Sequence, residues 1–166
     1  VALQQVLAGA RDKRDACQDA ATRALGEWPT PDAGSELLNL AKTITNPKYQ
    51  IRALRGYIRV FRQFGLPVEE RVQMAREALQ LARRTEDKVL VLHALLSFQN
   101  VQSLNLALES LGDPSLQATA AQVAIYITDQ VSDTAAIRQA MQKILDSGAE
   151  ERYTKQARDI LAKLGD

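Results

Sequence analysis

Hydrophobic residues recur at helical spacing along almost the whole chain. In the clearest segment, residues 47–64, apolar side chains stand three or four positions apart and would form one stripe on a helix: Ile51, Leu54, Ile58 and Phe61. Asn46 suits the N-cap of this helix, and Pro47 suits its first position. The same pattern predicts a helix at 12–25 and a second helix that begins at Ser35 and ends just before Thr45. It predicts further helices at 47–64, 69–84, 87–98, 102–111, 114–130, 133–146 and 149–164.

Proline and glycine mark the boundaries between these helices. The segment 26–32 carries two prolines that cannot continue a helix, and 65–67, 113–114 and 147–148 interrupt the pattern in the same way. Acidic residues open the helix at 69–84 and Arg83 and Arg84 close it, so both ends complement the helix dipole. No segment has the alternation of a strand, and we therefore expect an all-α protein.

A short motif repeats along the chain. Residues 38–42, Leu-Asn-Leu-Ala-Lys, recur 41 positions later as Leu-Gln-Leu-Ala-Arg at 79–83, and Leu-Asn-Leu-Ala returns at 104–107 after only 25 positions. Two helices in a unit of about 40 residues are typical of HEAT and armadillo repeats. Because one amphipathic helix hairpin cannot bury its apolar face alone, such units stack and share a core.

The alternative is a closed helical bundle, which has no reason to repeat a motif at fixed spacing. We predict an irregular α-solenoid of stacked antiparallel helix hairpins, with about 8–10 helices. A chain of 166 residues fits one domain, 1–166. Aromatic residues make up only 5%, whereas alanine and leucine are frequent, and this composition favours helices over a β-sandwich.

The turns between the predicted hairpins resemble those of bacterial HEAT-like repeats. The resemblance is carried by Ala21-x-x-Ala24-Leu25-Gly26-Glu27-Trp28-Pro29, by Asn46-Pro47 at the start of the next pair, and by Leu111-Gly112-Asp113-Pro114. It covers about Cys17 to Asp146. It implies an αα-superhelix with a concave face that binds proteins, and it carries over no catalytic residue. Similar repeats occur as segments of larger bacterial proteins, some of them exported.

No constellation of residues predicts catalysis, a metal site or a cofactor. His93 is the single histidine, and no local motif supplies a carboxylate to orient it. Cys17, the single cysteine, lies among alanines and is expected to be a small core residue. The pairs Glu69-Glu70, Glu86-Asp87 and Glu150-Glu151 stand at helix starts, where they suit the dipole better than a metal.

The charges are unevenly distributed, although the net charge is only +1. Residues 37–68 hold basic side chains without any Asp or Glu, and residues 89–137 hold acids without any Lys or Arg. Five of the basic residues recur at spacings of four and three and would line one face of the helix at 47–64: Lys48, Arg52, Arg55, Arg59 and Arg62. This face is either a solvated surface, with Glu69, Glu70 or more distant acids reaching across, or a surface for phosphates or an acidic partner.

Trp28 is the conspicuous aromatic residue of the turns, and it either anchors a partner or covers the end of a hairpin. With Lys48, Arg52, Arg55, Arg59 and Arg62 it makes up the predicted interaction surface. The leading functional hypothesis is a non-catalytic protein-binding or scaffolding module. One alternative is a protein that binds nucleic acid through the basic face and that could act on DNA bases. Another alternative is a structural spacer within a longer chain.

The chain contains no apolar run long enough for a membrane span. It begins at Val1 without a methionine, as a processed form or a segment of a longer protein would. The residues leave its compartment, its oligomeric state and its partner open.

Overall fold

The computed structural model describes residues 2–165, so the two ends of the predicted domain, Val1 and Asp166, lie outside this range. Within it the regular structure is helical, as predicted, and no strand occurs. Ten α-helices follow one another: α1 Ala2–Ala10, α2 Asp15–Gly26, α3 Gly34–Thr43, α4 Pro47–Gln63, α5 Val68–Leu81, α6 Thr85–Ala94, α7 Val101–Glu109, α8 Gln117–Thr128, α9 Thr134–Asp146 and α10 Glu151–Leu164. Short 3₁₀ turns lie at Pro31–Ala33, Leu95–Ser97 and Ser110–Gly112.

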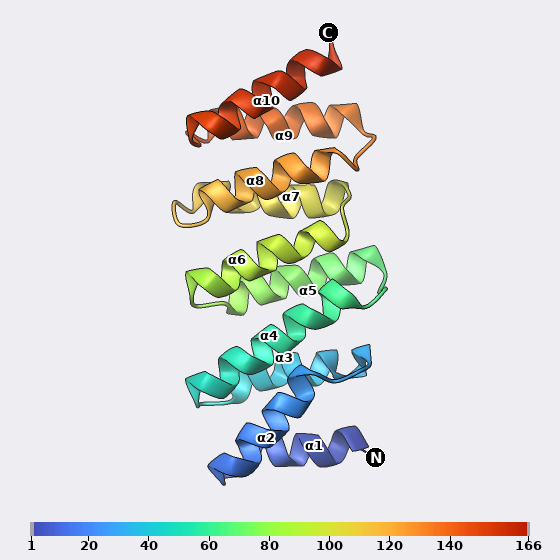
Figure 1. Ribbon diagram of the computed structural model, residues 1–166, viewed down its shortest axis with the longest axis vertical. Coiled ribbons are helices and arrows are strands. Elements are labelled where there is room, and N and C mark those ends of the chain that lie inside the picture. The colour runs from blue at the N-terminus through green and yellow to red at the C-terminus, as the bar shows by residue number, and fades with distance from the viewer. Residues whose placement is uncertain (1, 166) are drawn as a thin grey trace.

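The helices pair into five antiparallel hairpins that stack along the long axis of the molecule (Figure 1). Each even-numbered helix packs against the odd-numbered helix before it and against the next even-numbered helix, so α2, α4, α6, α8 and α10 form one layer. The odd-numbered helices form the other layer. One cluster of buried side chains runs through the stack from Leu7 to Ala157.

The predicted helices differ from the observed ones by a few residues at several ends, and two differences stand out. The opening segment with Leu3 and Val6, for which no helix is predicted, forms the helix α1, which packs against α2. Helix α5 ends at Leu81 rather than at Arg84, because the chain leaves the helical conformation at Ala82 to reverse into α6. Arg83 and Arg84 therefore lie in the turn, and Arg84 is the N-cap residue of α6.

The start of α4 follows the prediction closely. The Asn46 side chain accepts a hydrogen bond from the backbone N–H of Lys48 at 3.0 Å, and Pro47 occupies the first helical position. The predicted apolar stripe faces inward, since Leu54, Ile58 and Phe61 are buried. Helix α4 packs against α2, α3, α5 and α6, and it therefore joins three successive hairpins.

The repeated motif occupies one place in three successive hairpins. Residues 38–42 lie at the end of α3, residues 79–83 span the end of α5, and residues 104–107 lie in α7. The alanine of each copy is buried, at positions 41, 82 and 107. The irregular spacing of the copies follows from α4 and α5, which are longer than the next two helices, α6 and α7.

Helices α2 and α4 approach each other closely at Gly56. A Cβ added to Gly56 would stand 3.0 Å from the Cα of Gly26 and 3.0 Å from a methyl carbon of Leu37, which is fully buried. A Cβ added to Gly26 would meet no atom within 4 Å. The absence of a side chain at Gly56 therefore permits this contact between the two helices.

Replacing Gly56 with alanine should destabilise the protein by about 1 kcal/mol, since overpacking a core costs about 1–3 kcal/mol and the better helix propensity of alanine returns up to about 1 kcal/mol. Gly26→Ala is the matched control and should be neutral or slightly stabilising. Urea unfolding followed by circular dichroism measures both changes, and equal stabilities for the two variants would contradict the close contact.

Candidate functional site

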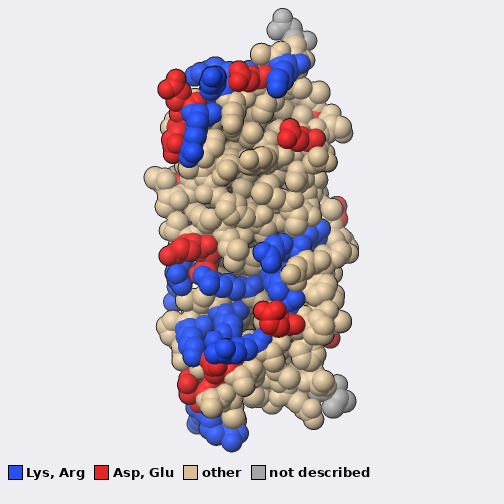
Figure 2. All heavy atoms as spheres, in the orientation of Figure 1, with Lys and Arg blue, Asp and Glu red and all other residues tan. Residues whose placement is uncertain are grey.

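The predicted basic face of α4 lies on the layer of even-numbered helices. Figure 2 shows Lys and Arg side chains gathered over the part of this face that α2, α4 and α6 occupy, whereas the surface over α7 and α8 is largely uncharged. An open groove of about 520 Å³ lies there. Five arginines line it, together with one carboxylate and a few uncharged residues: Arg23, Arg52, Arg55, Arg59 and Arg62, then Glu27, Gly26, Gly56, Ile58 and Leu90.

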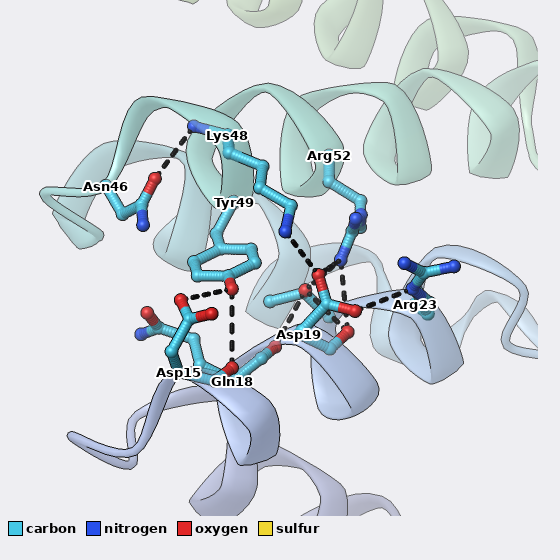
Figure 3. A network of polar contacts seen from close by, with 9 residues as sticks. Asp15, Gln18, Asp19, Arg23, Asn46, Lys48, Tyr49 and Arg52 are labelled. Carbon is cyan, nitrogen blue, oxygen red and sulfur yellow. Dashed lines mark hydrogen bonds and ion pairs between the residues drawn. The ribbon is translucent and has the colours of Figure 1, made fainter.

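Asp19 of α2 binds the first part of the basic face (Figure 3). Its carboxylate lies 2.7 Å from the Nζ of Lys48, and it also accepts hydrogen bonds from Arg23 at 2.8 Å and from Arg52 at 3.2 Å. These cations, led by Lys48, hold the pKa of Asp19 well below its ordinary value. Asp19 in turn raises the pKa of Lys48. The acid that neutralises this part of the face therefore comes from another helix, as one interpretation of the sequence allowed, although it is not Glu69 or Glu70.

Arg52 and Arg59 hold α2 in place against α4. Arg52 is half-buried and donates from Nη1 to the carbonyl oxygen of Asp19 at 3.0 Å. Arg59 donates from Nε to the carbonyl oxygen of Gly26 at 2.6 Å and from Nη2 to that of Trp28. The carbonyls that Arg59 binds lie at or beyond the C-terminal end of α2, where a cation is favourable and the last carbonyls lack helical partners. Both arginines are thereby committed to the fold.

Tyr49 adds a buried contact to the same interface. Its hydroxyl donates to the Asp15 carboxylate at 2.5 Å, and this hydrogen bond raises the pKa of Tyr49 (Figure 3). The ring itself is fully buried. Lys48 and Arg52 lie over its face, with 5.0 and 5.5 Å to the ring centre. The N-terminal part of the basic face thus belongs to a structural network between α2 and α4.

Arg55 is tethered on the other side of the groove. Its Nε donates at 2.8 Å to Asp87 of α6, a carboxylate that is only 1% exposed. Asp87 stands in the first turn of α6 as predicted, but it is also the buried partner of Arg55, which the sequence pattern did not indicate. A buried carboxylate is unfavourable without a cationic partner, so the pair with Arg55 also stabilises the packing of α4 against α6.

Three arginines nevertheless present guanidinium nitrogens to the groove. Arg23 and Arg55 are held through Nε, and in the described part of the chain their terminal nitrogens have no other hydrogen-bond partner. The exposed Arg62 side chain makes no ion pair or hydrogen bond with any described residue. A planar guanidinium with free terminal nitrogens can bind a carboxylate or phosphate through two hydrogen bonds. The groove therefore has the chemistry of an anion-binding site.

Trp28 and the acidic block have structural contacts. Trp28 is half-buried against the core, and its indole N–H donates to Asp32 at 3.1 Å. In the acidic segment, Glu109 pairs with Arg76 of α5 and Asp113 lies 3.6 Å from Lys88, while Asp133 caps α9 by accepting from Ala136 N–H at 3.0 Å. The segment is therefore not a uniform acidic surface.

The other candidates do not join this groove. His93 is exposed on α6, and Cys17 is half-buried on α2 rather than fully in the core. Over residues 2–165, no group of three or more His, Cys, Asp or Glu side chains is arranged to hold a metal ion. None of the helices described is both long enough and apolar enough to cross a membrane.

Sequence reasoning missed Arg23, Leu90 and Asp87 as neighbours of the basic face. Arg23 follows Asp19 by four positions in α2, a spacing typical of an ion pair within one helix. Leu90 and Asp87 belong to α6, and the periodicity of α6 does not reveal which neighbouring helix it faces. Their contribution depends on how the hairpins stack.

Replacing Lys48 with glutamine should raise the pKa of Asp19 toward its ordinary value of 3.8, because Lys48 makes the largest contribution to lowering it. An NMR titration of the carboxyl carbons measures this change, with the exposed Lys155→Gln as control. Because the folded pKa lies below the unfolded one, ionised Asp19 stabilises the fold above about pH 4, and this contribution is lost as the pH falls further. An unchanged Asp19 pKa in the Lys48 variant would contradict the network.

Comparison of the chain with models of protein families, with curated protein sequences and with solved structures finds no match. The resemblance of its turns to bacterial HEAT-like repeats therefore stays a prediction. The function of the chain has to be inferred from the groove and from the charges around it.

Proposed function

We propose that this chain is an α-solenoid of the HEAT-like kind and works as a non-catalytic binding module that docks an acidic segment of a partner protein. The observation that carries the proposal is the groove in which Arg23, Arg55 and Arg62 converge from two helices with free terminal nitrogens. A carboxylate-rich segment would satisfy these donors through charge-assisted hydrogen bonds.

The order of the helices supports the repeat part of the proposal. Three copies of one motif occupy the same place in successive hairpins, and each hairpin packs mainly on its neighbours. Such an arrangement is typical of repeat proteins, which present an extended surface to partners. The layer of α2, α4 and α6 would be that surface here.

The composition of the groove favours an acidic protein segment over a nucleic acid. No aromatic side chain lines the groove, whereas proteins that bind single strands stack bases on aromatic rings. The partly buried Leu90 contributes apolar area beside the arginines, which suits the aliphatic side chains of a peptide. The net charge of +1 also gives little general attraction for a phosphate backbone.

Arg62 offers the most direct test, because its side chain is exposed and makes no hydrogen bond or ion pair with a described residue. A labelled peptide of Glu, Asp and Leu should bind the chain in a fluorescence anisotropy titration. Arg62→Gln should weaken this binding roughly two- to fivefold, as expected for one partly solvated ion pair. Arg158→Gln, an exposed arginine of α10 remote from the groove, should bind as the wild type does.

The same titration separates the proposal from its alternatives. A matched peptide with Gln and Asn in place of the acids should bind much more weakly. Added salt should weaken the binding of the acidic peptide to the chain. Tighter binding of a single-stranded oligonucleotide, lost in the same variant, would favour the nucleic-acid alternative. Absence of binding by either ligand at low salt would reject the groove as a binding site and favour a structural spacer.

A further inference from the structure

A second hollow, of about 450 Å³, lies between the turn that joins α3 to α4 and the turn that joins α5 to α6. It shares no lining residue with the arginine groove. Its lining is largely apolar and includes Ile44, Ile51, Leu54 and Leu81. Ile51 and Leu81 are only partly buried, so an aliphatic group placed in the hollow would remove apolar surface from water.

Cations stand around this apolar floor. Lys42, Arg83 and Arg84 line the hollow, and all three are exposed. Arg84 lies 3.3 Å from Glu86, but Lys42 and Arg83 have no ion-pair partner within 4 Å among the described residues. The lining contains one carboxylate, that of Asp87, which is buried and bonded to Arg55 at 2.8 Å. The excess charge of the lining is therefore positive.

The repeated motif explains why these cations face one hollow. Lys42 and Arg83 occupy the same position, the last residue, of two motif copies that are 41 residues apart. The stacking of the two hairpins brings both ends to the same hollow. In the third copy the corresponding residue is Leu108, which is buried. The cation is thus specific to the first two copies, although the third keeps the apolar part of the motif.

We propose that this hollow binds a small aliphatic carboxylate, with the alkyl chain on the apolar floor and the carboxylate between Lys42 and Arg83. A pocket of this volume that combines apolar residues with a few charged groups is the usual arrangement for small molecules. A single anionic group satisfies the exposed cations, and a polyanion would leave the apolar floor uncovered. The site is independent of the arginine groove.

The probe is octanoate, which is titrated into the full chain. Two-dimensional NMR follows the backbone amide signals of the chain during the titration. Residues of the two turns and of the first half of α4 should shift, with saturation at millimolar or lower concentration. Octan-1-ol, which lacks the charge, and acetate, which lacks the chain, should each bind at least about tenfold more weakly. The double variant Lys42→Gln, Arg83→Gln should bind octanoate roughly tenfold more weakly than the unchanged chain does.

Two further variants test whether octanoate binds in this hollow and not elsewhere on the chain. Arg62→Gln should leave octanoate binding unchanged, because Arg62 lines only the arginine groove, and Lys155→Gln should do the same. Equal binding of octanoate and octan-1-ol, unchanged binding in the double variant, or shifts spread over all helices would overturn the proposal. Tighter binding of a short peptide that ends in leucine would also overturn it and would assign the hollow to the C-terminus of a partner.

Discussion

The close contact between α2 and α4 determines the geometry on which the candidate groove depends. At Gly56 the two helices approach until a single added carbon would touch both backbone and the buried Leu37. This approach brings the carbonyl end of α2 within reach of Arg59 and places Asp19 beside Arg52. Hydrophobic packing therefore sets the distance, and the charged side chains of α4 then find partners along α2.

The basic face of α4 has two roles that the spacing of its residues does not distinguish. Arg52 and Arg59 supply hydrogen bonds to carbonyl oxygens of α2 and of the turn after it, where the last turn of a helix leaves acceptors unsatisfied. Arg55, which binds Asp87 of α6 through Nε, and Arg62 keep guanidinium nitrogens for other ligands. Neutralisation by Asp19 and Asp87 is partial, because the lining of the groove still contains five arginines and one glutamate.

The buried Asp87 connects the arginine groove with the apolar hollow. It accepts a hydrogen bond from Arg55, which lines the groove, and it lines the hollow itself. A buried carboxylate requires such a partner, since an unpaired charge in the interior is strongly unfavourable. The first turn of α6 is therefore bound to α4 by an ion pair as well as by packing. This pair fixes the position of the arginine groove relative to the apolar hollow.

Hydrophobic periodicity and turn residues were sufficient to predict an all-α chain, most helix bounds and the capped start of α4 at Asn46 and Pro47. These features depend on neighbours within a few positions, which a sequence records directly. The groove could be predicted only in part: the arginines of α4 were identified, but Arg23, Asp87 and Leu90 were not. They meet α4 because the hairpins stack in one order and at one distance. Contacts between residues about 30 positions apart, such as that of Arg55 with Asp87, set this order and distance. Only the tertiary structure decides these contacts.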